Sequence, residues 1–186
     1  MDNTKVQLEN QCESIKKELE AIADGEAWRL SDDDSDNFYS AEAIIIEVIN
    51  KGKKEFVEAI ESLLESPIDY SDEDAVQAVI NNVLSKDESD FYEEDICEAL
   101  EDAGLIEKFT MYDYFSDNYR VEYVVGGDKD FRGVEITVAC GGPAIHINSD
   151  GTIKGRWWGT NVDTYMSKSA EDAVYDWGNE AWDCIK

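Results

Sequence analysis

The sequence predicts an α+β fold: an acidic helical part of four to five helices, then an antiparallel β-sheet of about four strands, then a C-terminal helix. Up to about residue 115, apolar residues recur at spacings of three and four, the period of an amphipathic helix. Beyond residue 116, short apolar or alternating segments are separated by Gly-Gly and Asn-Ser-Asp-Gly, which is typical of strands joined by hairpins. We therefore divide the chain into an acidic helical region, 1–115, and a sheet with its closing helix, 116–186, which could also form one continuous domain.

The first predicted helix covers residues 4–23, and Gly25 follows its end. Its apolar residues lie at heptad-like spacings and form one narrow seam of Leu8, Cys12, Ile15, Leu19 and Ile22. The seam has fewer heptads than a coiled coil needs. It can pack on the rest of its own domain, or it can pair with a second copy, which would make a homodimer through helix 4–23.

Further helices are predicted between residues 40 and 85. Ser40 is the predicted N-cap of a helix that Gly52 interrupts, and Pro67 follows the end of its continuation. Ser71 is the predicted N-cap of the next helix. The inward-facing residues of these helices are Ile44, Ile45, Val48, Ile49, Phe56, Val57, Ile60, Leu63, Leu64, Val76, Val79, Ile80, Val83 and Leu84.

The C-terminal part predicts strands at 119–125, 133–140, 144–148 and 152–159. A closing helix from about Ser169 would bury one face made of Val174, Trp177, Ala181 and either Cys184 or Ile185. On a strand, neighbouring Trp157 and Trp158 point to opposite faces. One can enter the core, and the other is either covered by Trp177 or Trp182 or exposed as a contact anchor; we take Trp158 as the candidate anchor.

Charge is the outlying property of the chain. Its 44 Asp and Glu against 16 Lys and Arg give a formal net charge of −28. A magnitude of roughly 2–8 suffices for the solubility of a small domain. Residues 1–115 have a net charge of −23 and residues 116–186 one of −5, so adaptation of the whole surface to high salt does not explain the acidity. The electric field of such a negative net charge repels nucleic acid and anionic membranes and attracts basic proteins.

No targeting or membrane segment is expected. The N-terminus lacks a basic segment followed by an apolar run, and the longest apolar stretch, "AIII" at 43–46, is far too short for a membrane span. The four cysteines are far apart without a C-x-x-C pair, which favours reduced thiols in the cytoplasm.

Catalytic and metal-binding motifs are weak. Asp32, Asp34 and Asp36 match the first positions of an EF-hand loop, but Asn37 and Ala43 replace the required Gly and Glu. Cys140 and the single histidine, His146, could form a thiol enzyme, for which loss of activity in Cys140→Ala would be the minimum evidence. The alternative is that neither residue is catalytic: His146 is then a surface residue on a strand, and Cys140 is a buried cysteine beside it. We expect no catalytic residue, no metal, no cofactor and no enzyme activity.

The stretch "ESDFYEEDICEALEDAG" at 88–104 holds eight carboxylates and no base. It predicts a helix with Asp90 as N-cap, Glu93 at N3 of a capping box and Gly104 at its end. Its inward face is Ile96, Ala99, Leu100 and Ala103, and its outward stripe is Glu94, Glu98, Glu101 and Asp102. A second acidic patch comprises Asp72, Glu73, Asp74, Asp87, Glu88 and Asp90. Like charges at i,i+4 repel, costing roughly 0.2–0.5 kcal/mol per pair.

Such a folded acidic array is similar to duplex DNA in charge. Duplex DNA has one negative charge per about 1.7 Å of axis, and helical carboxylates at i, i+3 and i+4 are about 5–6 Å apart, near the spacing of phosphates along a strand. In charge, size and acidic helices, residues 30–115 resemble small phage and mobile-element proteins that block restriction enzymes or CRISPR nucleases as DNA mimics. The stretch "GGPAIHINSDGTIKGRWWG" at 141–159 resembles a β-hairpin module of bacterial mobile-element proteins.

The resemblance implies stoichiometric inhibition of a basic DNA-binding nuclease in a bacterial host cell, without cofactor, turnover or direct nucleic-acid binding. The candidate contacts are the stripe, the second acidic patch and Trp158. An immunity protein that neutralises a basic nuclease toxin is the alternative, because it would use the same electrostatics. A chaperone or adaptor for basic proteins remains a further alternative.

Overall fold

The structure is a computed structural model that describes residues 3–31, 37–64, 67–85, 91–116, 119–140 and 142–185. The described residues form an α+β protein in two compact units. Unit 1 contains Met1–Gly25 and Thr110–Lys186, and unit 2 contains Glu26–Phe109. Unit 2 is therefore inserted into the sequence of unit 1.

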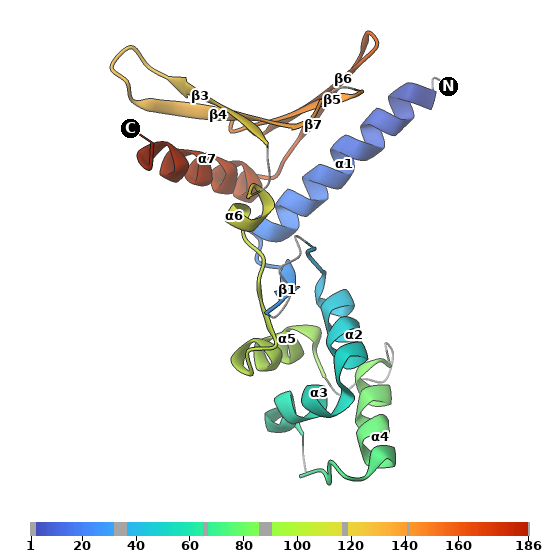
Figure 1. Ribbon diagram of the computed structural model, residues 1–186. Helices are drawn as coiled ribbons and strands as arrows, with labels where there is room; N and C mark the ends of the chain where they lie inside the picture. The colour runs from blue at the N-terminus through green and yellow to red at the C-terminus, as the bar shows by residue number, and fades with distance from the viewer. Residues whose placement is uncertain are drawn as a thin grey trace. The chain divides into compact units, whose positions relative to one another are not determined.

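Unit 1 is built on one five-stranded antiparallel sheet in which each strand pairs with the next along the chain. Helices α1 and α7 pack against the same face of this sheet, α1 under β6 and β7 and α7 under β4 (Figure 1). The elements of unit 1 are α1 (Asn3–Ala23), α6 (Met111–Tyr114), β3 (Arg120–Val125), β4 (Phe131–Ala139), β5 (Ala144–Asn148), β6 (Thr152–Trp157), β7 (Thr160–Tyr165) and α7 (Lys168–Asp183).

Helix α1 packs its apolar seam on its own unit. Leu8, Cys12 and Leu19 are fully buried, and Ile15 is half-buried. Helix α1 approaches β6 closely at Gly155, where an added Cβ would lie 2.8 Å from atoms of both Leu8 and Cys12. The seam therefore packs on the rest of its own unit, which is one of the two interpretations given for it. Nothing in the described residues supports the other, a homodimer through this helix.

Two hydrogen bonds join the C-terminal end of α1 to the start of α7. The backbone N–H of Ser167 donates to Glu20 Oε1 at 2.7 Å, and Ser169 Oγ donates to Asp24 Oδ1 at 2.8 Å. Ser167 is also the N-cap of α7. Carboxylates at and just beyond the end of α1 thus act as structural acceptors, a role that the chain's acidity does not reveal.

Unit 2 is a helical cluster closed by a two-stranded ladder. Its helices share one apolar core, whose fully buried members include Ile44, Phe56, Ile60 and Leu100. The antiparallel pair β1–β2 brings Trp28 opposite Lys108. The elements of unit 2 are β1 (Trp28–Leu30), α2 (Ala41–Lys51), α3 (Lys53–Ala59), the 3₁₀ helix η1 (Glu61–Leu63), α4 (Glu73–Val83), α5 (Glu93–Asp102) and β2 (Ile106–Lys108).

Several helix boundaries agree with the sequence. Ser40 is the N-cap of α2, and Gly52 separates α2 from α3. Gly25 and Gly104 follow helix ends with φ of 74° and 71°. These positive angles cost glycine little, because it has no Cβ.

Other expectations differ from the structure. The predicted division at residue 115 differs from the two units, because α1 belongs to unit 1, where it packs on the sheet and on α7. The described part has five strands in the large sheet and two in the small one instead of about four in all; the fifth, β7, is a polar edge strand. Cys184 and Ile185 are exposed and do not belong to the buried face of α7.

We predict that Gly155→Ala lowers the free energy of unfolding by about 1–3 kcal/mol, because its Cβ would overpack the contact with α1. Gly142→Ala is the matched control, since an added Cβ there meets nothing within 4 Å. Urea unfolding followed by circular dichroism measures both variants. Equal stability of the two variants would contradict the close packing of β6 on α1.

Candidate functional site

Helix α5 places most of its carboxylates on one exposed side. Its buried residues are Ile96, Cys97 and Leu100, which belong to the core of unit 2. This apolar spacing directs the remaining long side chains outward. The exposed acidic residues of α5 are Glu93, Glu94, Asp95, Glu98, Glu101 and Asp102, which include all four residues of the predicted stripe.

The stripe is not neutralised within the described part of the chain. There, none of its four carboxylates forms an ion pair with Lys, Arg or His. Several surface carboxylates of unit 1, in contrast to the stripe, lie within 4.0 Å of a basic group. Its ion pairs in the described ranges include Lys5–Glu9, Lys16–Glu13, Arg120–Glu122, Arg132–Asp128, Arg156–Asp163 and Lys168–Asp172.

The two ends of α5 differ electrostatically. Acidic residues in the first turn, such as Glu94, are stabilised by the positive end of the helix dipole. Glu101 and Asp102 lie at the opposite end, where the dipole disfavours negative charge by about 0.3–1 kcal/mol each and where no basic residue occurs. Helix stability alone therefore does not explain acids at the C-terminal end of α5.

Helix α5 begins later than the sequence predicts. Its N-cap is Tyr92, without a side-chain capping bond, and Glu93 is the first helical residue rather than N3 of a capping box. Asp90, the predicted N-cap, lies outside the described residues. Tyr92 is 78% exposed beside the acidic first turn. Tyr92 is not among the predicted contact residues; its place outside the apolar spacing of the helix is the signal that could have found it.

The second acidic patch is only partly described, and its first member has a structural role. Asp72, rather than Ser71, is the N-cap of α4 and accepts hydrogen bonds from the backbone N–H groups of Asp74 and Ala75 at 3.0 and 3.2 Å. Glu73 and Asp74 are exposed in the first turn. Asp87, Glu88 and Asp90 lie outside the described residues, as do Asp32, Asp34 and Asp36.

Ser71 instead bonds to Asp69. Its hydroxyl and its backbone N–H donate to Asp69 Oδ1 at 2.6 and 2.9 Å, and these bonds, the hydroxyl's first, hold the pKa of Asp69 below its ordinary 3.8. Because the folded-state pKa is depressed, this contact stabilises the fold above pH 3.8. The contribution is lost as the pH falls through the lower folded-state pKa.

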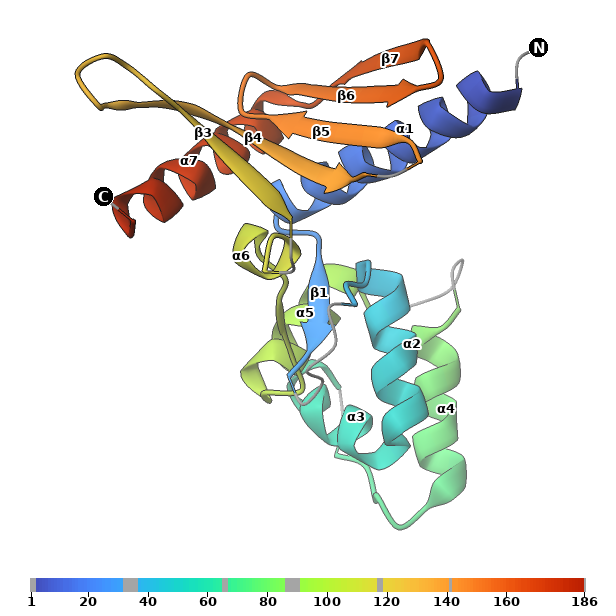
Figure 2. The same ribbon diagram turned by 45° about the horizontal axis from the view of Figure 1, so that its top comes forward.

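Basic residues lie close to the α4 patch. A cavity of about 620 Å³ is lined by Glu73 and Asp74 together with Lys53 and Lys54. Lys53 Nζ also donates to Gln77 of α4 at 2.7 Å. In both views α2 and α3 lie between α4 and α5 (Figures 1 and 2). The stripe and the described part of the second patch therefore form two separate surfaces, and Lys53 and Lys54 lie beside the second.

Trp158 lies in unit 1, in the turn between β6 and β7. It is 92% exposed, whereas Trp157 is half-buried. Trp177 packs instead against Phe115 with 4.6 Å between ring centroids. Of the two interpretations of the tryptophan pair, the exposed Trp158 is the one that the structure shows.

Cys140 and His146 line one cavity of about 500 Å³ in unit 1. Cys140 is exposed, so the expectation of a buried cysteine is wrong; the thiol lies at a strand end rather than within a strand. Nδ1 of His146 lies 3.1 Å from Thr137 Oγ1 and 3.3 Å from Glu135 Oε1. These contacts engage Nδ1 of the ring with groups on β4.

The buried thiols differ from the exposed ones. Burial raises the pKa of Cys97 to about 12 and also raises the pKa of Cys12. We predict that iodoacetamide at about pH 8 labels Cys140 and Cys184 in the native chain and leaves the two buried thiols unmodified, because the thiolate is the reacting species. Mass spectrometry of peptides measures the labels, with urea-unfolded chain as the control. Rapid native labelling of Cys97 would contradict the packing of α5.

We predict that Asp72→Ala lowers the free energy of unfolding by about 1 kcal/mol, because it removes the N-cap of α4. Asp72→Asn should retain most of this stability, since its amide oxygen can accept the same bonds. Glu73→Ala is the control for the loss of an exposed acid. If Asp72→Ala unfolds at the wild-type urea concentration, the capping role is wrong.

Comparisons with known proteins do not assign a family. No protein-family model matches the chain, and no curated protein and no solved structure matches it significantly. Within the described ranges, no group of three or more His, Cys, Asp or Glu could hold a metal ion. None of the described helices combines the length and the apolar character needed to cross a bilayer.

Proposed function

We propose that this protein is a stoichiometric inhibitor of a DNA-binding defence nuclease, either an RNA-guided nuclease or a restriction enzyme. The exposed face of α5 occupies the basic groove in which the nuclease binds DNA. The observation that supports this proposal is the stripe of Glu94, Glu98, Glu101 and Asp102, which is exposed and forms no ion pair within the described part of the chain.

The spacing of the stripe is similar to that of a DNA strand. At about 1.5 Å of rise per residue, its four carboxylates span about 12 Å along the helix axis. One strand of duplex DNA has a phosphate every ~3.4 Å of axis. Three intervals over about 12 Å therefore give nearly the same linear charge density, and a groove that binds one strand could bind this helix face.

The core of unit 2 holds these charges in place before binding. Ile96, Cys97 and Leu100 are at most 1% exposed, so α5 cannot rotate its acidic side away without exposing apolar area. A preorganised acidic surface loses little conformational entropy on binding. Tyr92 adds an exposed aromatic side chain at the start of the same helix.

Binding by charge requires no cofactor and no turnover, so the protein acts in proportion to its amount. It does not bind nucleic acid itself, because a net charge of −28 repels it. The site of action is the cytoplasm of the bacterial host. An immunity protein for a basic nuclease toxin is the alternative function, in which the same stripe blocks a smaller target.

We predict that reversing charges on α5 with Glu98→Lys and Glu101→Lys weakens nuclease binding by about 100-fold, because two charge-assisted contacts are lost. The melting temperature should stay equal or rise, since repulsion along the helix decreases. Glu73→Lys with Asp74→Lys on α4 is the matched control of equal charge change, and it should weaken binding less. Equal losses in both variants would show that the overall field acts rather than one face.

The measurement is a salt-titrated competition with purified RNA-guided nucleases, type I restriction enzymes and a basic nuclease toxin, in which DNA binding and cleavage are scored separately. Mimicry predicts that DNA binding is lost, that excess DNA restores it and that inhibition weakens steeply with salt. Cys140→Ala should inhibit as the wild type does; its loss of function would favour the thiol enzyme. Inhibition of the toxin alone would favour the immunity protein, and blocked cleavage with DNA still bound would contradict mimicry.

A further inference from the structure

The turn between β6 and β7 holds a tryptophan in an unfavourable backbone conformation. Trp157 and Thr160 are the last paired residues, so the loop consists of Trp158 and Gly159 alone. Both have positive φ, 47° and 82°, as in a type I′ turn. Asn-Gly or Asp-Gly fits such a turn, whereas a bulky residue with positive φ is strained. Turn formation therefore does not explain a tryptophan at this position.

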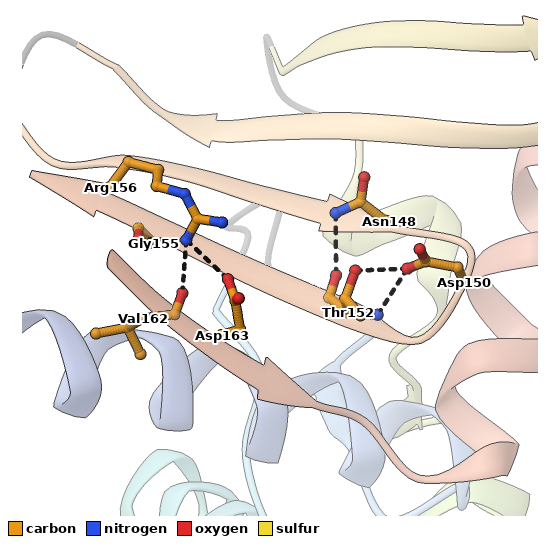
Figure 3. Close-up of polar contacts among 7 residues, drawn as sticks. All are labelled: Asn148, Asp150, Thr152, Gly155, Arg156, Val162 and Asp163. Carbon is orange, nitrogen blue, oxygen red and sulfur yellow. Dashed lines mark hydrogen bonds and ion pairs between the residues drawn. The ribbon is translucent and has the colours of Figure 1, made fainter. Parts of the chain in front are cut away.

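The neighbouring strands hold this turn firmly. Nη1 of Arg156 donates to the backbone carbonyls of Gly155 and Val162 at 2.9 and 3.0 Å, and it lies 2.7 Å from Asp163 Oδ1 (Figure 3). One guanidinium group thus links β6 to β7 close to the turn. Trp158 projects from a fixed backbone, which limits the entropy that it loses when a partner contacts it.

The surroundings of Trp158 differ from the rest of this acidic chain. A shallow hollow of about 430 Å³ lies beside the turn, and the described residues that line it include no Asp or Glu, although Asp163 pairs with Arg156 at its edge. Tryptophan and arginine are the side chains most often found to dominate the binding energy of protein interfaces. The residues that line the hollow are Gly142, Arg156, Trp157, Trp158, Gly159 and Asn161.

We propose that Trp158 is a second, apolar contact with the inhibited nuclease, inserting into an apolar pocket on the protein surface outside the basic groove. This inference rests on the proposed function. The two contacts differ in chemistry: α5 presents negative charge, and the β6–β7 turn presents an aromatic ring without a carboxylate in the adjoining hollow. Binding through α5 must weaken with salt, whereas binding through Trp158 must not.

Trp158→Asn tests the inference, because asparagine suits a type I′ turn and keeps the hairpin. We expect its melting temperature to rise by about 2–4 °C through relief of strain. We also expect its affinity for the inhibited nuclease, taken from the purified panel above, to fall about 30-fold at both about 0.05 M and about 0.5 M NaCl. Tyr165→Thr is the matched control, since Tyr165 is a 67% exposed aromatic residue on the same hairpin outside the turn, and it should bind as the wild type does.

The other outcomes overturn the inference. If Trp158→Asn binds like the wild type at both salt concentrations while the α5 reversal weakens binding, Trp158 is no contact and the proposed function stands. A lower melting temperature of Trp158→Asn would assign Trp158 a structural role. Self-association of the wild type in sedimentation that Trp158→Asn abolishes would make the partner a second copy. If no nuclease in the panel binds the wild type, the proposed function fails and this inference fails with it.

Discussion

Burial of apolar side chains in unit 2 is the interaction on which the proposed site depends. Residues 26–109 include 25 acidic and 6 basic residues, a net charge of −19, and such a surface repels itself. Ile44, Phe56 and Leu100 are fully buried in the shared core that opposes this repulsion. The acidic face of α5 therefore exists only as long as its apolar face stays packed.

The stripe differs from the other acidic residues that have partners in both units. Several carboxylates pair with basic side chains, such as Glu9 in unit 1 and Glu107 in unit 2, and others accept structural hydrogen bonds, as Glu20 and Asp24 do from the start of α7. In unit 2, the stripe on α5 has neither kind of partner within the described residues. No contact within the described part of the chain neutralises its charge, which therefore remains available to another molecule. This difference, more than the total charge, is what distinguishes a candidate interaction surface from a merely acidic protein.

Sequence periodicity predicted the helices well where one face is apolar and a strong local signal marks the end. Ser40, Gly52 and Gly104 are such signals, and the structure has helix boundaries at all three. The predicted start of α5 was wrong because the aromatic and acidic residues before Glu93 are compatible with either a helix or a loop. Strand β7 was missed because its Thr, Asn and Asp residues suit an edge strand but lack the usual apolar alternation.

The stripe was predictable because a single helix determines it, whereas relations between helices were not. No local pattern indicates that α2 and α3 lie between α4 and α5 (Figure 2). Likewise, the sequence reveals the apolar seam of α1, but it does not reveal that β6 and β7 cover this seam. The exposure of Trp158 depends on the register of β6 and β7, since a shift of one residue would have placed it on a strand face.

The insertion of unit 2 has a consequence for the order of folding. Helix α1 leaves the ribosome before unit 2, whereas its partners β6 and β7 are made after unit 2. Closing a flexible loop of 84 residues between the two parts of unit 1 would cost roughly 4 kcal/mol in chain entropy beyond a constant term. In unit 2, the β1–β2 ladder already pairs Trp28 with Lys108, and the N–H of Phe109 donates to the carbonyl of Ala27 at 3.0 Å. Once the acidic unit has folded during synthesis, this ladder holds the two ends of the insertion together, and unit 1 assembles as though the intervening residues were a short connection.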